Sequence, residues 1–367
     1  MTALPTQALD YPFDERFIAA QAAEPRDSAR LMVVHRADGR VEHRRVRDLP
    51  EYLGAGDRLV LNRTAVRRAR FMGRRVTGTR VTEGLFLDPT GDGCWNALVK
   101  HSNRFHAGDL LRLIDPHGHE TQDHVRLIER AGDGWKVRIE GPGSADAVFE
   151  RSGWTPLPPY IRRARGGDEA SAGDAEARDH ARYQTVYARP EAVGSVAAPT
   201  AGLHFTQPLL QSLRARGVQE LELLLDVGAG TFKPVETPTL AEHRMHREHF
   251  SVPAATLAAL RALAPERAAG RARLVVVGTT TVRALESLPD PLPAADTDLD
   301  GSTEILIAPG HRFRFVDALM TNFHLPRSTL LALVGALVGL ERLKELYALA
   351  QHEGYRFYSY GDAMLIL

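Results

Sequence analysis

Two short apolar runs in the second half of the chain constrain its fold more than any other feature. Leu221–Val227 and Leu274–Val277 have the pattern of buried β-strands, and each ends at a turn rich in glycine and threonine. Stretches of helical composition follow at 255–269 and 327–350. Because strands alternate with helices, this half of the chain predicts an α/β fold with a mostly parallel sheet.

The chain between residues 60 and 152 has a different pattern. Glycines recur at short intervals, and the pieces between them, such as Trp95–Val99 and Trp135–Ile139, have the length and composition of short strands. This spacing favours a small antiparallel β-barrel. We therefore expect two domains: an α/β catalytic domain formed by residues 1–59 and 153–367, and an inserted β-barrel domain at 60–152.

Composition narrows the class of protein further. Basic and acidic residues cancel, 46 against 46, and 44% of the residues are hydrophobic, which excludes a disordered chain and a general coat of positive charge. The apolar run at 330–340 is shorter than the roughly 18 residues of a membrane span. Cys94 is the single cysteine, and no secretory signal pattern is evident. We expect a cytoplasmic protein with no membrane partner.

The turns that end the two apolar runs are candidates for ligand binding. Gly228-Ala-Gly-Thr and Gly278-Thr-Thr-Thr place backbone N–H groups and hydroxyls at the carboxyl edge of the sheet, where open α/β sheets bind ligands. Neither turn has the Gly-Lys-Ser/Thr end of a P-loop, and the first lacks the third glycine of a dinucleotide fingerprint. The alternative is an ordinary strand-to-helix turn with a threonine cap.

Three histidines, His243, His246 and His249, recur every third residue and could face one metal ion. Their surroundings match neither His-Glu-x-x-His nor His-x-x-Glu-His. A polar segment that contacts a substrate is therefore the favoured interpretation, and a metal-dependent hydrolase is kept as an alternative.

Arginines cluster at 63–75, with no acidic residue among them, and again at 162–165. Guanidinium groups suit phosphate oxygens, although runs of charge are more often solvated surface. The candidates for binding nucleic-acid phosphates are Arg67, Arg68, Arg70, Arg74, Arg162 and Arg163.

The C-terminal region combines polar and aromatic residues at 317–329 and 355–364. Since a chain end normally frays, this concentration indicates that the tail docks into a site. An aromatic patch that only fills the core is the alternative.

These segments, in this order, resemble the S-adenosylmethionine:tRNA ribosyltransferase-isomerases of queuosine biosynthesis. The resemblance spans nearly the whole chain and departs from the family pattern at Arg63, where Asp or Asn is usual, and at Asp226, where His is common. The motifs that carry it include Gly56–Thr64, Tyr183–Tyr187, Val196–Phe205, Val227–Val235, Val277–Ser287, Thr321–Leu330 and Tyr355–Met364.

The resemblance implies a transferase that has no resident cofactor and no metal. Such enzymes consume S-adenosylmethionine, moving its ribosyl carbons onto the aminomethyl nitrogen of a 7-deazaguanine at the wobble position of tRNA. Adenine and methionine leave, and epoxyqueuosine is formed. The implied fold is an α/β domain with an inserted β-barrel, and the implied partners are S-adenosylmethionine and tRNA. We expect a monomer. A tRNA-binding paralogue without catalysis is the non-enzyme alternative.

This chemistry requires general acid–base groups that act near pH 7. The sulfonium acidifies the adjacent ribose hydrogens, departing adenine needs a proton or hydrogen bonds, and the acceptor amine must be neutral. The catalytic candidates are His204, His324, Asp362 and Glu286. The substrate-binding candidates are Thr200, Gly202, Tyr183, Gln184, Gly228, Gly230, Thr231, Thr279, Thr280, Arg283, Asn322, Ser359 and Tyr360.

Overall fold

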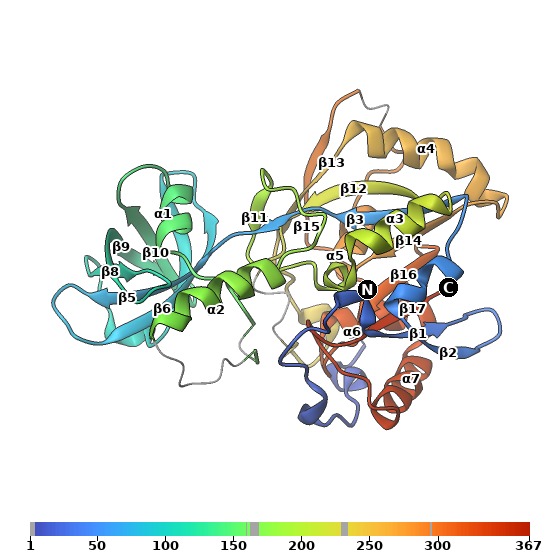
Figure 1. Ribbon diagram of the computed structural model, residues 1–367, viewed down its shortest axis with the longest axis horizontal. Coiled ribbons are helices and arrows are strands. Elements are labelled where there is room, and N and C mark those ends of the chain that lie inside the picture. Colours follow the sequence, from blue (N-terminus) through green and yellow to red (C-terminus); the bar gives the residue numbers. More distant parts are fainter. Residues whose placement is uncertain (1–3, 159, 162–168, 229–233, 294–295) are drawn as a thin grey trace. The chain divides into compact units, whose positions relative to one another are not determined.

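The computed structural model describes residues 4–158, 160–161, 169–228, 234–293 and 296–367. The chain divides into two compact units (Figure 1). The first, which we call the sheet unit, comprises Met1–Ala65, Thr185–Ala192 and Ala198–Leu367. The second, the barrel unit, comprises Val66–Gln184 and Val193–Ala197.

The sheet unit is built on a nine-stranded sheet. In spatial order its strands are β15 (Leu299–Thr303), β13 (Glu248–Val252), β12 (Gln219–Leu225), β3 (Asp57–Asn62), β14 (Arg273–Val277), β16 (Ala318–Asn322), β17 (Ala363–Ile366), β1 (Arg30–Val34) and β2 (Val41–Arg45). The two apolar runs therefore form β12 and β14, as predicted, and the α/β class is confirmed.

The sheet is mixed, so the prediction of a mostly parallel sheet was wrong. The pairs β12–β3, β3–β14, β14–β16 and β17–β1 are parallel, whereas β15–β13, β13–β12, β16–β17 and β1–β2 are antiparallel. Short connections explain part of the difference. The turn from β1 to β2 covers only residues 35–40, which is too short for the crossover that a parallel pair needs.

Helices cover the central strands. The unit contains α3 (Gln207–Ala215), α4 (Ala254–Ala268), α5 (Thr279–Glu286), α6 (Thr329–Val338) and α7 (Leu340–His352). Alternate residues of β3, β14 and β16 join Leu209, Leu210 and Leu213 of α3 in one buried cluster, while α5 packs against β3, β12 and β14. The central strands are therefore covered on both faces of the sheet. Because residues on either face are buried, such strands need continuous apolar sequence.

Short 3₁₀ helices connect these elements, and one of them supplies part of the site described below. They are η1 (Thr6–Leu9), η2 (Glu15–Phe17), η3 (Arg26–Ser28), η4 (Val46–Glu51), η6 (Thr200–His204) and η8 (Leu240–Glu242).

The C-terminal tail is part of the sheet. β17 lies between β16 and β1, and all four of its residues are buried. The helical stretch that precedes it is divided into α6 and α7 at Gly339, whose φ of +86° is a conformation that favours glycine.

The barrel unit holds six antiparallel strands that close on themselves in the order β10-β7-β6-β5-β8-β9. It extends past the range expected from the sequence, because it runs to Gln184, which adds α2, and also includes Val193–Ala197. Its elements are β5 (Arg70–Arg75), β6 (Val81–Pro89), β7 (Cys94–Val99), η5 (Ser102–Arg104), β8 (Leu110–Ile114), β9 (Glu120–Ala131), β10 (Gly134–Glu140), α1 (Ala145–Ser152) and α2 (Glu169–Arg182).

Two further strands, β4 (Ala65–Val66) and β11 (Val193–Ser195), form a separate two-stranded sheet. None of the helices in the described ranges has the length and apolar character needed to cross a bilayer.

Candidate functional site

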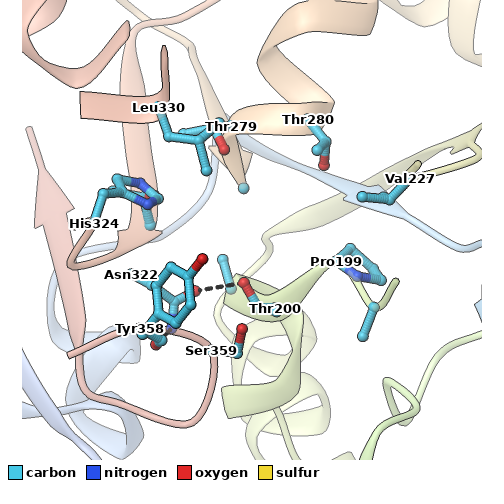
Figure 2. Close-up of a pocket in the computed structure, with 14 residues that line it drawn as sticks. Pro199, Thr200, Val227, Thr279, Thr280, Asn322, His324, Leu330, Tyr358 and Ser359 are labelled. Atoms are coloured by element: carbon cyan, nitrogen blue, oxygen red, sulfur yellow. Dashed lines mark hydrogen bonds between the residues drawn. The ribbon is translucent and has the colours of Figure 1, made fainter. Parts of the chain in front are cut away.

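A pocket of about 450 Å³, partly open to solvent, lies at the carboxyl ends of β14 and β16. Figure 2 shows its lining, all of which belongs to the sheet unit. The lining residues are Ala198–Ala201, Val227, Gly278–Thr280, Thr321, Asn322, His324, Leu330, Tyr358 and Ser359.

The sheet explains why these segments meet. β14 and β16 are parallel neighbours, so the residues that follow them reach the same edge. Gly278 ends β14 with a φ of +89°, and α5 starts at the next residue. Thr279 and Thr280 thus stand in the first turn of a helix that opens on the pocket, where backbone N–H groups are free of helical partners.

The side-chain amide of Asn322 is the centre of the pocket's hydrogen bonds. Its Oδ1 accepts a hydrogen bond from the Thr200 hydroxyl at 3.1 Å, and its Nδ2 donates to the backbone oxygen of Tyr358 at 3.1 Å. Nδ2 also lies 3.2 Å from Nε2 of His204. Both amide hydrogens are therefore used within the protein, and His204 Nε2 acts as an acceptor.

His204 is held in its neutral form. Burial lowers the pKa of His204 to about 4; Asp362 opposes this shift, whereas Arg356 and Arg26 add to it. Neutrality agrees with the acceptor role of Nε2 toward Asn322. Although His204 contacts a pocket residue, it is not among the described residues that line the pocket.

His324 does line the pocket. Its backbone is fixed on both sides, because its N–H donates to the Tyr347 hydroxyl at 3.0 Å and its carbonyl accepts from the Tyr11 hydroxyl at 2.6 Å. Nε2 of the ring lies 3.0 Å from the Thr321 hydroxyl. Burial lowers the pKa of His324 to about 3, so the ring is neutral at pH 7 and can exchange hydrogen bonds with a ligand.

Comparison with known proteins identifies the family. The family model described as "Queuosine biosynthesis protein" matches residues 6–366. The S-adenosylmethionine:tRNA ribosyltransferase-isomerase of Gloeobacter violaceus is 47% identical over 99% of this chain and 96% of its own length. The enzyme of the same name from Moorella thermoacetica is 45% identical over 98% of this chain and 99% of its own length. The chain belongs to the queuosine biosynthesis protein family.

A solved structure agrees with this assignment. The crystal structure of S-adenosylmethionine tRNA ribosyltransferase from Thermotoga maritima matches with a TM-score of 0.53 and 33% identity, covering 98% of this chain and all of the other. The resemblance noted in the sequence motifs is therefore confirmed at the level of the family.

Six of the residues that were predicted from the family motifs meet in the pocket: Thr200, Thr279, Thr280, Asn322, His324 and Ser359. Gly202 lies next to it in η6, where a β-carbon would come within 2.0 Å of the Tyr187 hydroxyl. Gly228 follows the lining residue Val227, and Tyr360 is buried beside Ser359. Gly230 and Thr231 lie outside the described residues.

The carboxylates of Asp362 and Glu286 are occupied by backbone N–H groups. The Asp362 carboxylate accepts hydrogen bonds from the backbone N–H groups of Arg30 at 3.0 Å and Arg356 at 2.8 Å. The Glu286 carboxylate accepts from the backbone N–H groups of Arg314 at 3.0 Å and Phe315 at 2.9 Å. Neither side chain belongs to the described lining.

Arg283 is almost completely buried, and its guanidinium pairs with the equally buried Glu248. The other oxygen of Glu248 accepts a hydrogen bond from the backbone N–H of Gly228 at 3.4 Å. Arg283 therefore links α5 to the segment after β12 and, within the described lining, does not reach the pocket surface.

Tyr183 and Gln184 belong to the barrel unit. Tyr183 is buried, and the amide of Gln184 exchanges two hydrogen bonds with the backbone of Val66, at 2.9 and 2.8 Å. Neither residue is among the described residues that line the pocket, so their predicted contact with a substrate stays a prediction.

The four candidate arginines in the barrel unit lie close to acidic residues from other parts of the chain. Arg70 lies 3.0 Å from Glu83 and Arg74 lies 2.7 Å from Glu120. Arg67 and Arg68 are less exposed and approach Asp146, Glu150 and Glu176 at 3.5 to 4.0 Å. Arg162 and Arg163 lie outside the described residues. Although the sequence around these arginines contains no acidic residue, the fold brings acidic residues close to them.

The two departures from the family pattern are accommodated within the sheet unit. Arg63 contacts Glu220 at 3.0 Å and Glu222 at 2.7 Å, and Asp226 accepts a hydrogen bond from the Thr64 hydroxyl at 3.1 Å. Each replacement therefore has a partner of suitable charge or polarity.

The metal-dependent alternative gains no support. In the part of the chain that the structure describes, no three His, Cys, Asp or Glu residues are grouped to hold a metal ion. His243 follows η8, and His249 lies in β13.

Sequence reasoning missed seven lining residues: Ala198, Pro199, Ala201, Val227, Thr321, Leu330 and Tyr358. Each lies within one of the family motifs named above, so membership of a motif was the signal that could have identified it. Neither the pocket-facing direction of Leu330 nor the wall formed by Tyr358 can be deduced from residue type.

Proposed function

We propose that this protein transfers and isomerises the ribosyl moiety of S-adenosylmethionine onto 7-aminomethyl-7-deazaguanine at the wobble position of tRNA. Adenine and methionine leave, and epoxyqueuosine is the product. The observation that supports this most strongly is the 47% identity, over 99% of the chain, to an enzyme that bears this activity in its name. The protein is accordingly a transferase.

The pocket at β14 and β16 is the proposed substrate site. Thr200, Thr279, Thr280 and Ser359 surround it, and their hydroxyls suit the hydroxyls of a ribose. The first turn of α5 offers backbone N–H groups that favour a negatively charged group such as a carboxylate. S-adenosylmethionine enters as a consumed substrate, and we propose that no resident cofactor or metal takes part.

His324 is the proposed catalytic histidine, because it is the predicted acid–base candidate that lines the pocket. As a neutral ring it can hold the departing adenine by hydrogen bonds or accept a proton. We propose that His204 acts as a positioning residue, since it reaches the pocket through Asn322. Asp362 supports the same arrangement by ordering the loop from Arg356 onward.

We further infer that the barrel unit is an inserted domain and that Arg70 and Arg74 contribute to tRNA binding. Their partners Glu83 and Glu120 are themselves partly exposed, so phosphates can compete for the guanidinium groups. A cytoplasmic location follows from the tRNA substrate and from the free thiol of Cys94.

One experiment tests the proposed function. The purified protein is incubated with S-adenosylmethionine and tRNA that carries 7-aminomethyl-7-deazaguanine, and free adenine and the nucleoside mass are measured. We expect adenine release together with a heavier nucleoside, and neither with guanine-bearing tRNA. Binding of tRNA without adenine release would instead indicate a non-catalytic paralogue.

A further inference from the structure

One residue of the pocket has an unusual backbone conformation. Tyr358 has a φ of +76°, a left-handed value that is strained for a bulky side chain. The residue is 8% exposed and lines the pocket. In the described part of the chain only two other non-glycine residues, His101 and Arg327, have positive φ, and neither lines this pocket.

Hydrogen bonds hold Tyr358 in this conformation. Its N–H donates to the backbone oxygen of Phe323 at 3.1 Å. Its carbonyl accepts from Nδ2 of Asn322 at 3.1 Å and from the N–H of Gly361 at 3.0 Å. The end of β16 therefore determines the backbone of Tyr358, and with it the direction of the ring.

Glycine would adopt the same backbone conformation without strain. Tyrosine at position 358 therefore differs from glycine in supplying an aromatic ring at the cost of that strain. Figure 2 shows this ring in front of Asn322, with its hydroxyl end directed into the space between Asn322, His324 and Thr279. Strained conformations that the surroundings enforce are concentrated at functional sites.

Polar groups of the pocket can bind the edge of a flat ligand, whereas the Tyr358 ring can bind its face. Asn322 is the residue whose amide would be expected to read the edge of a base, but both of its Nδ2 hydrogens are engaged with Tyr358 and His204. The remaining polar lining consists of hydroxyls and of His324, the group proposed above to hydrogen-bond the edge of adenine. An aromatic face binds any base by stacking, without needing a particular set of donors and acceptors.

We propose that the Tyr358 ring is the stacking platform for a purine-type base in this pocket and that the strained backbone is retained to present it. The inference rests on the proposed function, in which both substrates carry such a base: the adenine of S-adenosylmethionine and the 7-deazaguanine of the tRNA.

Three substitutions separate the ring from the backbone. Tyr358→Phe keeps the aromatic face, Tyr358→Leu keeps apolar bulk without it, and Tyr358→Gly removes the side chain and relieves the strain. Binding of S-adenosylmethionine is measured by calorimetry on the full chain. We expect Phe to bind within threefold of wild type, and Leu and Gly to bind about 10- to 100-fold more weakly, as the loss of base stacking implies.

Thermal unfolding supplies a second readout, for the backbone strain. We expect Tyr358→Gly to lower Tm less than Tyr358→Ala does, because both lose the buried ring and only glycine adopts the positive φ without strain. The matched control is His101→Gly, which removes a side chain at a φ of +54° in the barrel unit. This control is expected to leave the binding of S-adenosylmethionine unchanged.

Two arms distinguish the source of the base. A weaker affinity of the Tyr358→Leu and Tyr358→Gly variants for S-adenosylmethionine identifies adenine as the stacked base. A raised KM for tRNA carrying the deazaguanine, with unchanged affinity for S-adenosylmethionine, identifies the base of the tRNA. Unchanged values in both arms, or a Leu variant equal to wild type, would overturn the proposal. Adenine release by the wild type tests the proposed function separately.

Discussion

Nδ2 of Asn322 lies 3.2 Å from Nε2 of His204, and this contact joins the end of β16 to the 3₁₀ helix η6. The same amide accepts a hydrogen bond from the Thr200 hydroxyl and donates one to the carbonyl of Tyr358. One buried side chain therefore holds together three segments that are distant in the sequence.

Asn322→Ala is expected to weaken the whole pocket. The change leaves Thr200, His204 and the Tyr358 carbonyl without this partner in a buried region, and an unsatisfied buried group costs about 1–3 kcal/mol. We expect a loss of unfolding free energy of that order in urea denaturation, together with weaker binding of S-adenosylmethionine. Asn322→Asp, which keeps the acceptor and loses both donors, should show a similar defect. An alanine variant as stable as wild type would contradict this account.

The two buried histidines make stability depend on pH. An unfolded imidazole titrates near pH 6.5, whereas burial lowers the pKa of His204 to about 4 and that of His324 to about 3. Between pH 6.5 and these lower values the unfolded chain binds protons that the folded chain does not. The free energy of unfolding should therefore fall as the pH is lowered through this window.

The measurement is urea denaturation between pH 4.5 and 7.5. His324→Gln is expected to reduce the steepness of the pH dependence, because it removes one of the groups that titrate differently in the two states. His352→Gln serves as the control, since the side chain of His352 is 82% exposed. An equal effect of the two substitutions would rule out the buried histidine as the cause.

Gly202→Ala tests the close packing beside the pocket. A β-carbon at this position would lie 2.0 Å from the Tyr187 hydroxyl and 2.9 Å from Cγ2 of Thr185. Overpacking of this kind typically costs about 1–3 kcal/mol. Tyr187→Phe removes the clashing oxygen, so the double variant should recover part of the stability lost by Gly202→Ala. Gly54→Ala, where no atom lies within 4 Å, is the control, and purely additive effects would refute the contact.

The strands and turns around the pocket could be predicted because their signals are local. Leu274–Val277 has the uninterrupted apolar pattern of a strand that is covered on both faces. The first run alternates instead, with Leu221, Leu223 and Leu225 buried and the residues between them half-buried. The turn at Gly278 follows directly from where the second strand ends. The order of the strands is a different matter, because nothing local places β17 between β16 and β1.

The roles of individual polar residues could not be predicted for a similar reason. The motifs identify Asp362 and Glu286 but do not reveal that backbone N–H groups of Arg356 and Arg314 occupy their carboxylates. Likewise, the acid that faces Arg74 comes from Glu120, 46 residues away. A side chain's chemistry can be read from its type, whereas its availability depends on partners that folding brings from elsewhere.

Glu248→Gln is expected to be strongly destabilising. Glu248 and Arg283 are 2% and 3% exposed, and removing one partner of a buried ion pair typically costs about 3–5 kcal/mol. We expect a loss of this order in urea denaturation. Replacing both residues, as in Glu248→Gln with Arg283→Met, should cost less than the single change because no buried charge is left unpaired. A mild effect of Glu248→Gln alone would contradict the importance of the pair.

Arg74 and Arg67 should respond differently to substitution, although both come from one arginine cluster. The side chain of Arg74 is 40% exposed, so a phosphate can reach it, whereas that of Arg67 is 14% exposed and packs over the Trp95 ring at 4.9 Å. We expect Arg74→Ala to weaken tRNA binding and to reduce the slope of log affinity against log salt by about one. Arg67→Ala should chiefly lower Tm.

The control is Arg271→Ala, at an exposed position in the sheet unit. It should change neither the salt slope nor the affinity for tRNA. An unchanged salt slope in Arg74→Ala would remove this arginine from the tRNA contacts, because the slope reports the phosphates that a protein neutralises.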